Sequence, residues 1–186
     1  MTPQINTLFD EAQIADRVST LAQEIAADAP HRLLVVAVLK GSFIFAADLV
    51  RALHRVGQQL EMEFMHLSSY GAGTTSTELK VLRDVESDVS GRDIILVDDI
   101  LESGRTLSFA KERLLSRGAR SVKIAALLDK PEHRKATIEA DYVGFVCPDK
   151  FVVGFGMDMG HAWRQLPYIG YVVVDDEPRL DKATGG

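Results

Sequence analysis

Apolar residues along the chain form two patterns, continuous runs and helical stripes. The continuous runs are rich in Val, Ile and Leu, which predicts strands that are buried on both faces. These runs are residues 33–39, 94–97 and 122–128. The helical stripes cover residues 10–28, 43–55 and 106–117. Because predicted strands alternate with predicted helices, we expect an α/β fold with a mainly parallel twisted sheet flanked by helices.

Shorter segments complete the predicted sheet. Leu60, Met62 and Phe64 stand at alternate positions, which is the period of a half-buried strand. Further strand candidates are residues 78–85, 142–146, 151–155 and 171–174. The length suits a single domain over residues 1–186, with a small hood formed by the termini.

Two segments lack the apolar periodicity of an element. Residues 68–77 are rich in Gly, Ser and Thr, so we expect a mobile loop there. Residues 177–186 are polar, and we expect them to form a disordered tail. The rest of the chain shows no linker that would divide it.

Composition narrows the class of protein. The chain has 21 Lys and Arg against 27 Asp and Glu, a formal net charge of −6, so we expect no nucleic-acid partner. No apolar run approaches the roughly twenty residues that a spanning helix needs, and the start lacks a signal-peptide pattern, so we expect no membrane partner. Cys147 is the single cysteine, which excludes an internal disulfide. A reducing compartment fits best, and we expect a cytoplasmic protein.

The densest chemical signal follows the second buried run. Asp98 and Asp99 end that predicted strand, Glu102 comes next, and Ser-Gly-Arg-Thr at 103–106 opens a helix. Ligands in open α/β sheets bind outside the carboxyl ends of strands. A glycine-containing turn at a helix N-terminus suits a phosphate, whereas paired carboxylates accept hydrogen bonds from a vicinal diol or hold a metal. A ribose 5-phosphate therefore fits this string.

One other interpretation of the string stays open from the residues alone, and a second lacks the partner motif that it needs. Asp98 and Asp99 can be ordinary capping or salt-bridging groups at a loop. A Walker B strand also places acids after apolar residues, but it requires a G-x-x-x-x-G-K-[ST] partner, and the chain contains none.

The string 93–106 resembles the phosphoribosyl diphosphate (PRPP) signature of the type I phosphoribosyltransferases. Segment 148–158, Pro-Asp-Lys-Phe-Val-Val-Gly-Phe-Gly-Met-Asp, resembles the purine-binding part of the 6-oxopurine branch, the hypoxanthine-guanine phosphoribosyltransferases. Leu-Lys-Gly-Ser at 39–42, Leu-Leu-Asp-Lys-Pro at 127–131 and Trp-Arg-Gln-Leu-Pro at 163–167 fit the same branch. The resemblance implies the type I phosphoribosyltransferase fold.

This resemblance implies a role for each matching residue. Glu102 would be the general base, acting beside Asp98 and Asp99 as catalytic residues. The residues implied to bind PRPP and its phosphates are Lys40, Gly41, Ser69, Tyr70, Ser103, Gly104, Arg105, Thr106 and Arg164. The residues implied to bind the purine are Lys130, Phe151 and Val152, through the 6-oxo group, ring stacking and backbone contacts respectively. The residues implied to hold Mg²⁺ are Asp158, Asp98 and Asp99.

Glu102 departs from the family pattern, which has aspartate at the general-base position. Glutamate has similar basicity and a longer arm, so we expect the role to persist with altered geometry. The resemblance also implies that the loop at Tyr70 closes over the site and excludes water. It implies, in addition, that the peptide between Leu39 and Lys40 can be cis.

The resemblance therefore implies a purine salvage enzyme. It would transfer 5-phosphoribosyl from PRPP to hypoxanthine or guanine, giving IMP or GMP and pyrophosphate, with Mg²⁺ as cofactor and a homodimer or homotetramer as its assembly. The alternative is an RNA-binding regulator on the same fold that senses PRPP or a nucleotide, although such a regulator would not need Lys130 and segment 148–158. A third interpretation is a Mg²⁺-dependent phosphohydrolase that uses Asp98 and Asp99, which turnover of simple phosphate esters would favour.

Overall fold

The computed structural model describes residues 3–70 and 78–173 of the chain. In chain order, its elements are β1 (Gln4–Phe9), α1 (Glu11–Ala27), β2 (Leu34–Leu39), α2 (Phe43–Arg55), β3 (Glu61–Tyr70), β4 (Glu78–Arg83), β5 (Asp93–Leu101), α3 (Arg105–Ser116), β6 (Ser121–Asp129), a 3₁₀ turn (Pro131–His133), β7 (Tyr142–Val146), β8 (Val152–Val153) and β9 (Ile169–Val173).

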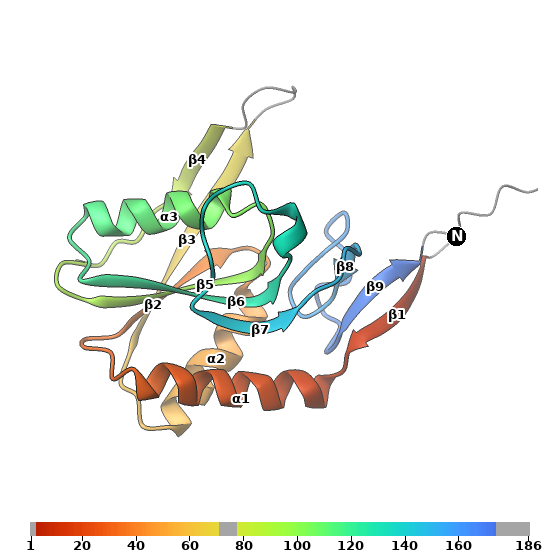
Figure 1. Ribbon diagram of the computed structural model, residues 1–186, viewed down its shortest axis with the longest axis horizontal. Helices are drawn as coiled ribbons and strands as arrows, with labels where there is room; N and C mark the ends of the chain where they lie inside the picture. Colours follow the sequence, from red (N-terminus) through yellow and green to blue (C-terminus); the bar gives the residue numbers. More distant parts are fainter. Residues whose placement is uncertain (1–2, 71–77, 174–186) are drawn as a thin grey trace, which may run out of the picture.

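The central layer is a six-stranded sheet in the order β4-β3-β2-β5-β6-β7. Its pairs are parallel except for the edge strand β4, which runs antiparallel to β3. Figure 1 shows α1 and α2 on one face of this sheet and α3 on the other. The parallel arrangement brings the carboxyl ends of β2, β5 and β6 to one edge, which is where α/β sheets bind ligands.

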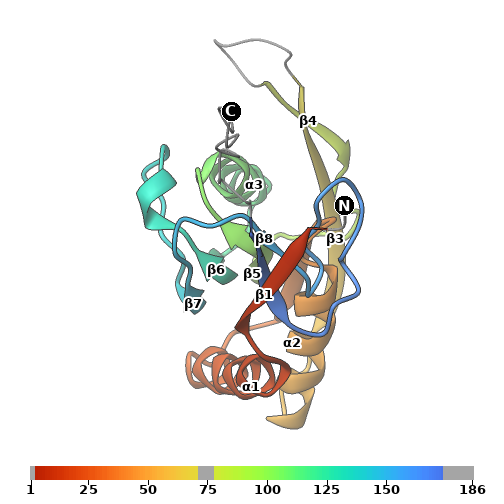
Figure 2. The ribbon, with the colours of Figure 1, turned by 90° about the vertical axis from the view of Figure 1, so that its right-hand side faces the viewer.

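A second sheet, in the order β1-β9-β8, forms a hood beyond the carboxyl ends of β6 and β7 (Figure 1). It is antiparallel, with Asn6 opposite Tyr171 on one side and Val152 opposite Tyr171 on the other. Figure 2 views the hood from its side, with β1 in front and α1 and α2 below it. Residues from both ends of the chain therefore build the hood.

Two apolar clusters fill the space on the two faces of the central sheet. One packs α1 and α2 against the sheet through residues such as Leu21 and Phe45. The other packs α3 through Leu107 and Leu114. Residues 34–37 of β2 are fully buried and alternate between the clusters. This explains the continuous apolar run, because both faces of the strand are covered.

The α/β fold with its mainly parallel sheet is confirmed. The expected start of α1 is also confirmed, since the Gln13 N–H donates to Asp10 Oδ1 and the Asp10 N–H donates to Gln13 Oε1, both at 2.9 Å. The sequence pattern does not indicate β1, and it makes β8 too long, because β8 spans only Val152–Val153. On β3, Phe64 is 38% exposed whereas Met65 is fully buried, the reverse of the expected alternation.

Part of the chain carries predictions that fall outside the described residues. These are most of the loop expected at 68–77 and the tail expected at 177–186. In the part that the structure describes, no helix is long and apolar enough to cross a membrane.

Candidate active site

Two adjacent carboxylates, Asp98 and Asp99, lie near the carboxyl end of β5. Asp98 is buried, and its Oδ1 accepts a hydrogen bond of 3.0 Å from the Asp99 N–H. Burial, together with the neighbouring charge of Asp99, raises the pKa of Asp98 well above its ordinary value. Burial also raises the pKa of Asp99, although hydrogen bonding to Asp98 and the charge of Arg164 oppose this. Such a pair favours a ligand that brings hydrogen-bond donors or positive charge.

The turn from β5 into α3 encloses a cavity of about 230 Å³. Its lining residues are Asp98, Asp99, Ile100, Leu101, Glu102, Ser103, Gly104, Thr106 and Leu107. Gly104 caps the N-terminus of α3 with a φ of 78°, a left-handed conformation that costs glycine nothing. Free backbone N–H groups at this helix end suit a phosphate. Arg105 is exposed and stands apart from the cavity lining.

Residues 135–138, which follow β6, pack against the turn at 103–106. The carbonyl oxygen of Ser103 accepts hydrogen bonds from the Lys135 and Ala136 N–H groups, at 2.9 and 3.0 Å. A Cβ atom on Gly104 would collide with Ile138 of the same segment. The conformation of the turn is thus fixed by its own glycine and by residues 135–138.

The loop after β2 lies against the same carboxylates. Its Leu39–Lys40 peptide is cis, as the resemblance implies. Gly41 approaches the carboxylate of Asp99 so closely that a side chain at this position would collide with it. Lys40 is exposed, which leaves its ammonium group open to solvent or to a ligand.

Lys130 follows the carboxyl end of β6 and is 6% exposed. Its Nζ donates a hydrogen bond of 2.7 Å to the carbonyl oxygen of Lys150 and lies 3.6 Å from Oε1 of Glu102. Lysine has three donor hydrogens, so Nζ can still donate to a carbonyl oxygen on a ligand. The predicted purine-binding cation and the predicted general base therefore face the same space.

Two phenylalanines of segment 151–155 have opposite environments. Phe151 is 55% exposed, whereas Phe155 is buried at 6%. Val152, next to Phe151, is 7% exposed and pairs with Tyr171 of the hood. The exposed ring of Phe151 is free to stack on a planar ligand, and Phe155 belongs to the core.

Asp158 and Arg164 form an ion pair of 2.6 Å. Arg164 also donates to the Gly156 carbonyl oxygen at 2.6 Å, and Gly156 lies against the carbonyl oxygen of Gly41. Gly156 therefore connects Arg164 to the loop at Gly41.

The three predicted metal-binding carboxylates, Asp98, Asp99 and Asp158, do not gather into one cluster in the described part of the chain. Within residues 3–70 and 78–173, no three Asp, Glu, His or Cys side chains gather into a group that could hold a metal ion. A metal at this site would have to take part of its ligands from substrate or water.

One part of the predicted site lies outside the described residues, and one contact of the site was not predicted from the sequence. The backbones of Ser69 and Tyr70 pair with β4, but residues 71–77 of the predicted closing loop lie outside the described residues. The contact of Lys130 with Lys150 joins the loop after β6 to the loop before β8, and no local motif signals it.

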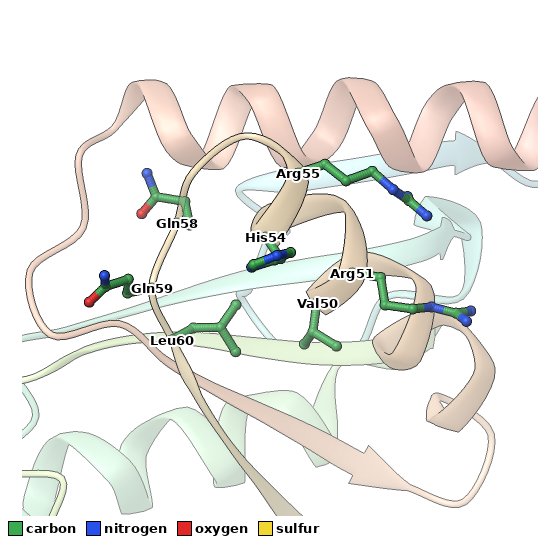
Figure 3. Close-up of a pocket in the computed structure, with 7 residues that line it drawn as sticks. All are labelled: Val50, Arg51, His54, Arg55, Gln58, Gln59 and Leu60. Atoms are coloured by element: carbon green, nitrogen blue, oxygen red, sulfur yellow. The ribbon is translucent and has the colours of Figure 1, made fainter.

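A separate hollow of about 570 Å³ lies at the far end of α2 (Figure 3). Arg51 and Arg55 extend to one side of it, and Gln58 and Gln59 lie on the other, so these polar groups do not converge on one point. None of the predicted site residues lines this hollow.

Comparisons with known proteins identify the relatives of this chain. A family model for the phosphoribosyl transferase domain matches residues 4–159. The hypoxanthine-guanine phosphoribosyltransferase of Bacillus subtilis is 46% identical over 88% of this chain and 90% of its own length. The hypoxanthine phosphoribosyltransferase of Escherichia coli K12 is 40% identical over 95% of this chain and 100% of its own length. These relatives do not support the alternative of an RNA-binding regulator.

A longer relative and a solved structure complete the comparison. The bifunctional protein TilS/HprT of Listeria innocua is 47% identical over 88% of this chain, but the match spans only 25% of that protein. The crystal structure of a hypoxanthine-guanine phosphoribosyltransferase from Bacillus anthracis is 42% identical, with a TM-score of 0.86 over 91% of this chain and 100% of that chain. The chain therefore belongs to the phosphoribosyltransferase family and, within it, to the hypoxanthine-guanine phosphoribosyltransferases, which are purine salvage enzymes.

Proposed function

We propose that this chain transfers the 5-phosphoribosyl group of PRPP to N9 of hypoxanthine or guanine and releases pyrophosphate. The observation that carries the proposal is that the glycine turn at 103–106, the carboxylates Asp98 and Asp99, and the pair of Lys130 with Glu102 lie together near the carboxyl ends of the neighbouring strands β5 and β6. A ligand with a phosphate at one end, a diol in the middle and a carbonyl-bearing ring at the other end would use all three. The names of the relatives support the same reaction.

The PRPP end of the ligand would be held by three groups of residues. The turn 103–106 would bind the 5-phosphate through backbone N–H groups and hydroxyls, with Arg105 at its rim. Asp98 and Asp99 would accept hydrogen bonds from the ribose hydroxyls. The residues proposed to face the pyrophosphate are Lys40, Gly41, Ser69, Tyr70 and Arg164. Arg164 suits that role because its planar fork matches paired oxygens.

Glu102 would accept the proton that the purine loses as N9 bonds to the anomeric carbon. Its carboxylate would also stabilise the positive charge that builds on the ribose in the transition state. Lys130 would donate to the 6-oxo group, Phe151 would stack on the ring, and backbone groups at Val152 would contact the edge of the base.

We propose Mg²⁺ as the cofactor, held by Asp98 and Asp99 together with PRPP oxygens, and by Asp158 on the pyrophosphate side. The donor set fits, because Asp98 and Asp99 bring adjacent carboxylate oxygens to the cavity, and oxygen atoms are the ligands that Mg²⁺ takes. Mg²⁺ commonly takes one or two carboxylates and completes its shell with water and phosphate oxygens. When bound, it supplies charge neutralisation for the leaving pyrophosphate.

We propose that the protein works in the cytoplasm as a homodimer or homotetramer, with neither nucleic acid nor a membrane as partner. The formal net charge of −6 and the single cysteine support this setting. Light scattering after size-exclusion chromatography would measure the assembly directly, and a monomeric mass would contradict it.

The test of the proposed function is incubation with PRPP, Mg²⁺ and each of hypoxanthine, guanine, xanthine and adenine, with nucleotide formation followed by chromatography. We expect IMP or GMP and an equal amount of pyrophosphate, and no product when EDTA removes Mg²⁺. Steady release of phosphate from simple phosphate esters, without nucleotide formation, would contradict the proposal and favour a phosphohydrolase.

A further inference from the structure

Lys150 connects the purine end of the site to the hood, and the proposed mechanism does not use it. Its carbonyl oxygen accepts the 2.7 Å hydrogen bond from Lys130 Nζ. Its own ammonium group lies 3.6 Å from the centre of the Tyr171 ring on β9. One residue thus contacts both the cation proposed to read the purine and a strand of the hood.

The hood holds both Tyr171 and the backbone around Lys150. The Asn6 side-chain N–H donates to Tyr171 Oη at 3.3 Å, and the Val172 N–H donates to the Phe151 carbonyl oxygen at 3.0 Å. The Lys150 N–H donates to the Pro148 carbonyl oxygen at 2.7 Å. The Asn6 hydrogen bond, followed by the charge of Lys150, lowers the pKa of Tyr171. Lys150 is therefore fixed at its N–H, its carbonyl and its ammonium end.

We propose that Lys150 is a positioning residue, which aims the Nζ of Lys130 at the 6-oxo group of the purine and is itself held in place by the ring of Tyr171. This inference rests on the proposed function and extends it to a residue that does not touch the reacting atoms.

The chemistry of Lys130 explains why such positioning matters. A lysine has a flexible four-carbon arm, so its ammonium group is a poor reader of one oxygen atom unless another contact fixes it. Glu102, at 3.6 Å, draws Nζ toward the general base. The Lys150 carbonyl supplies a neutral acceptor that holds one of the three Nζ hydrogens, and this leaves the others for Glu102 and for a ligand.

The ammonium end of Lys150 keeps that carbonyl oriented. A cation over an aromatic face is attracted by the ring quadrupole. Without this anchor the exposed side chain moves freely, and the peptide between Lys150 and Phe151 loses one of its constraints. We therefore expect a loss in purine recognition, with PRPP binding at the phosphate turn left as it is.

The experiment compares Lys150→Met and Lys150→Arg with the wild-type chain by steady-state kinetics in both substrates. For Lys150→Met we expect the KM for hypoxanthine to rise about 3- to 10-fold, which is within the range that a cation–π contact can supply. The KM for PRPP should change less than about 2-fold, within the scatter expected for a group that does not contact it. Lys150→Arg keeps a cation over Tyr171 and should restore most of the affinity for hypoxanthine.

Tyr171→Leu tests the same contact from the ring side and should reproduce the effect of Lys150→Met on hypoxanthine. Lys123→Met is the matched control, because Lys123 also lies over a tyrosine ring, that of Tyr142, at 5.7 Å, and is absent from the proposed site. It should leave both KM values unchanged.

The outcomes separate three explanations. A purine-specific rise in KM that arginine rescues supports the positioning role. A lower melting temperature with a reduced active fraction, but an unchanged KM for hypoxanthine in Lys150→Met and Tyr171→Leu, would show that Lys150 serves the stability of the hood alone. Absence of nucleotide formation by the wild-type chain would instead overturn the proposed function itself.

Discussion

The Nζ atom of Lys130 lies 3.6 Å from the Oε1 atom of Glu102, so the cation proposed to read the purine is within ion-pair distance of the proposed general base. The side chain of Lys130 is 8% exposed and that of Glu102 is 49% exposed. A pair with one solvated member contributes about 1 kcal/mol or less to stability. The pair therefore matters for ligand binding more than for stability, because a ligand that contacts one of these two groups also contacts the other.

Adenine should be a poor substrate. Lys130 only donates hydrogen bonds, and a 6-amino group would present it with another donor in place of an acceptor. An unpaired buried group costs about 1–3 kcal/mol, so kcat/KM for adenine should fall about 10- to 100-fold below that for hypoxanthine. Competition kinetics with both bases would measure the ratio. If adenine is used as well as hypoxanthine, the assignment to 6-oxopurines is wrong.

Glu102→Gln should lower kcat by about 10²- to 10⁴-fold, the usual contribution of a general base. Glutamine keeps the shape and hydrogen-bonding reach of the side chain but cannot accept the purine proton. The affinity for PRPP should change much less, because backbone groups of the turn hold the phosphate. Single-turnover kinetics and PRPP titration would separate the two effects.

Glu102→Asp provides the control for that prediction. It keeps a carboxylate of similar basicity, so activity should be far higher than in Glu102→Gln, although the shorter arm moves the carboxylate away from Lys130. A kcat within a few-fold of wild type in Glu102→Gln would show that Glu102 merely favours the N-terminus of α3, worth about 0.3–1 kcal/mol.

Gly104→Ala should raise the KM for PRPP about 10-fold. Alanine in the left-handed conformation costs about 1–3 kcal/mol, and this strain would distort the turn that is proposed to bind the phosphate. The residue has a φ of 78°, and a Cβ there would meet Ile138. Gly57→Ala is a matched control, since Gly57 has a φ of 86° but no atom within 4 Å of the added Cβ. Gly57→Ala should lower stability alone, and equal effects of both variants on PRPP would contradict the proposed phosphate site.

Asp93 should make the stability of the fold depend on pH. Arg120, followed by the His31 N–H and Ser121, holds the pKa of Asp93 well below its usual range. The folded form therefore stays ionised where the unfolded chain binds a proton. The resulting stability is fully present above about pH 4, the ordinary pKa of an aspartate, and is lost as the pH falls toward the lower pKa of the folded form.

Asp93→Asn should remove this contribution. We expect a loss of about 1.5–3 kcal/mol at pH 7, the range for hydrogen bonds to a charged group, and a smaller loss at pH 3. Urea unfolding at both pH values would measure it, and an equal loss at the two values would contradict the role of the charge. Activity at pH 7 should remain, because Asp93 begins β5 at the end of the strand opposite Asp98.

Local patterns were sufficient for the elements whose partners lie nearby in the chain. The buried run of β2 and the capping pair of Asp10 and Gln13 each determine their structure through immediate neighbours. β1 differs, because Gln4 to Phe9 becomes a strand through pairing with β9 at the other end of the sequence. The burial of Phe64 and Met65 was predicted the wrong way round for another reason. Both faces of β3 are partly covered, and the alternation does not show which face is more buried.

The candidate site likewise has a part that the sequence predicts and a part that it does not. Asp98 and Glu102 could be predicted from the sequence, because they lie on one strand and on the turn that directly follows it. The contacts of Lys130 with Lys150 and of Gly156 with Gly41 are created only when separate sheets and loops pack together. Residue type gives no sign of either contact, so these contacts could be seen only in the folded chain.

The pairing of β1 with β9 also sets an order of events during synthesis. The residues of β5 and α3, which form the phosphate turn, are close together in the chain, whereas the hydrogen bond of Asn6 with Tyr171 spans 165 positions. Short loops close at a lower entropic cost than long ones. A nascent chain therefore carries the residues of β5 and α3, and with them the proposed phosphate turn, well before β9 can pair with β1 and place Tyr171 beside Lys150.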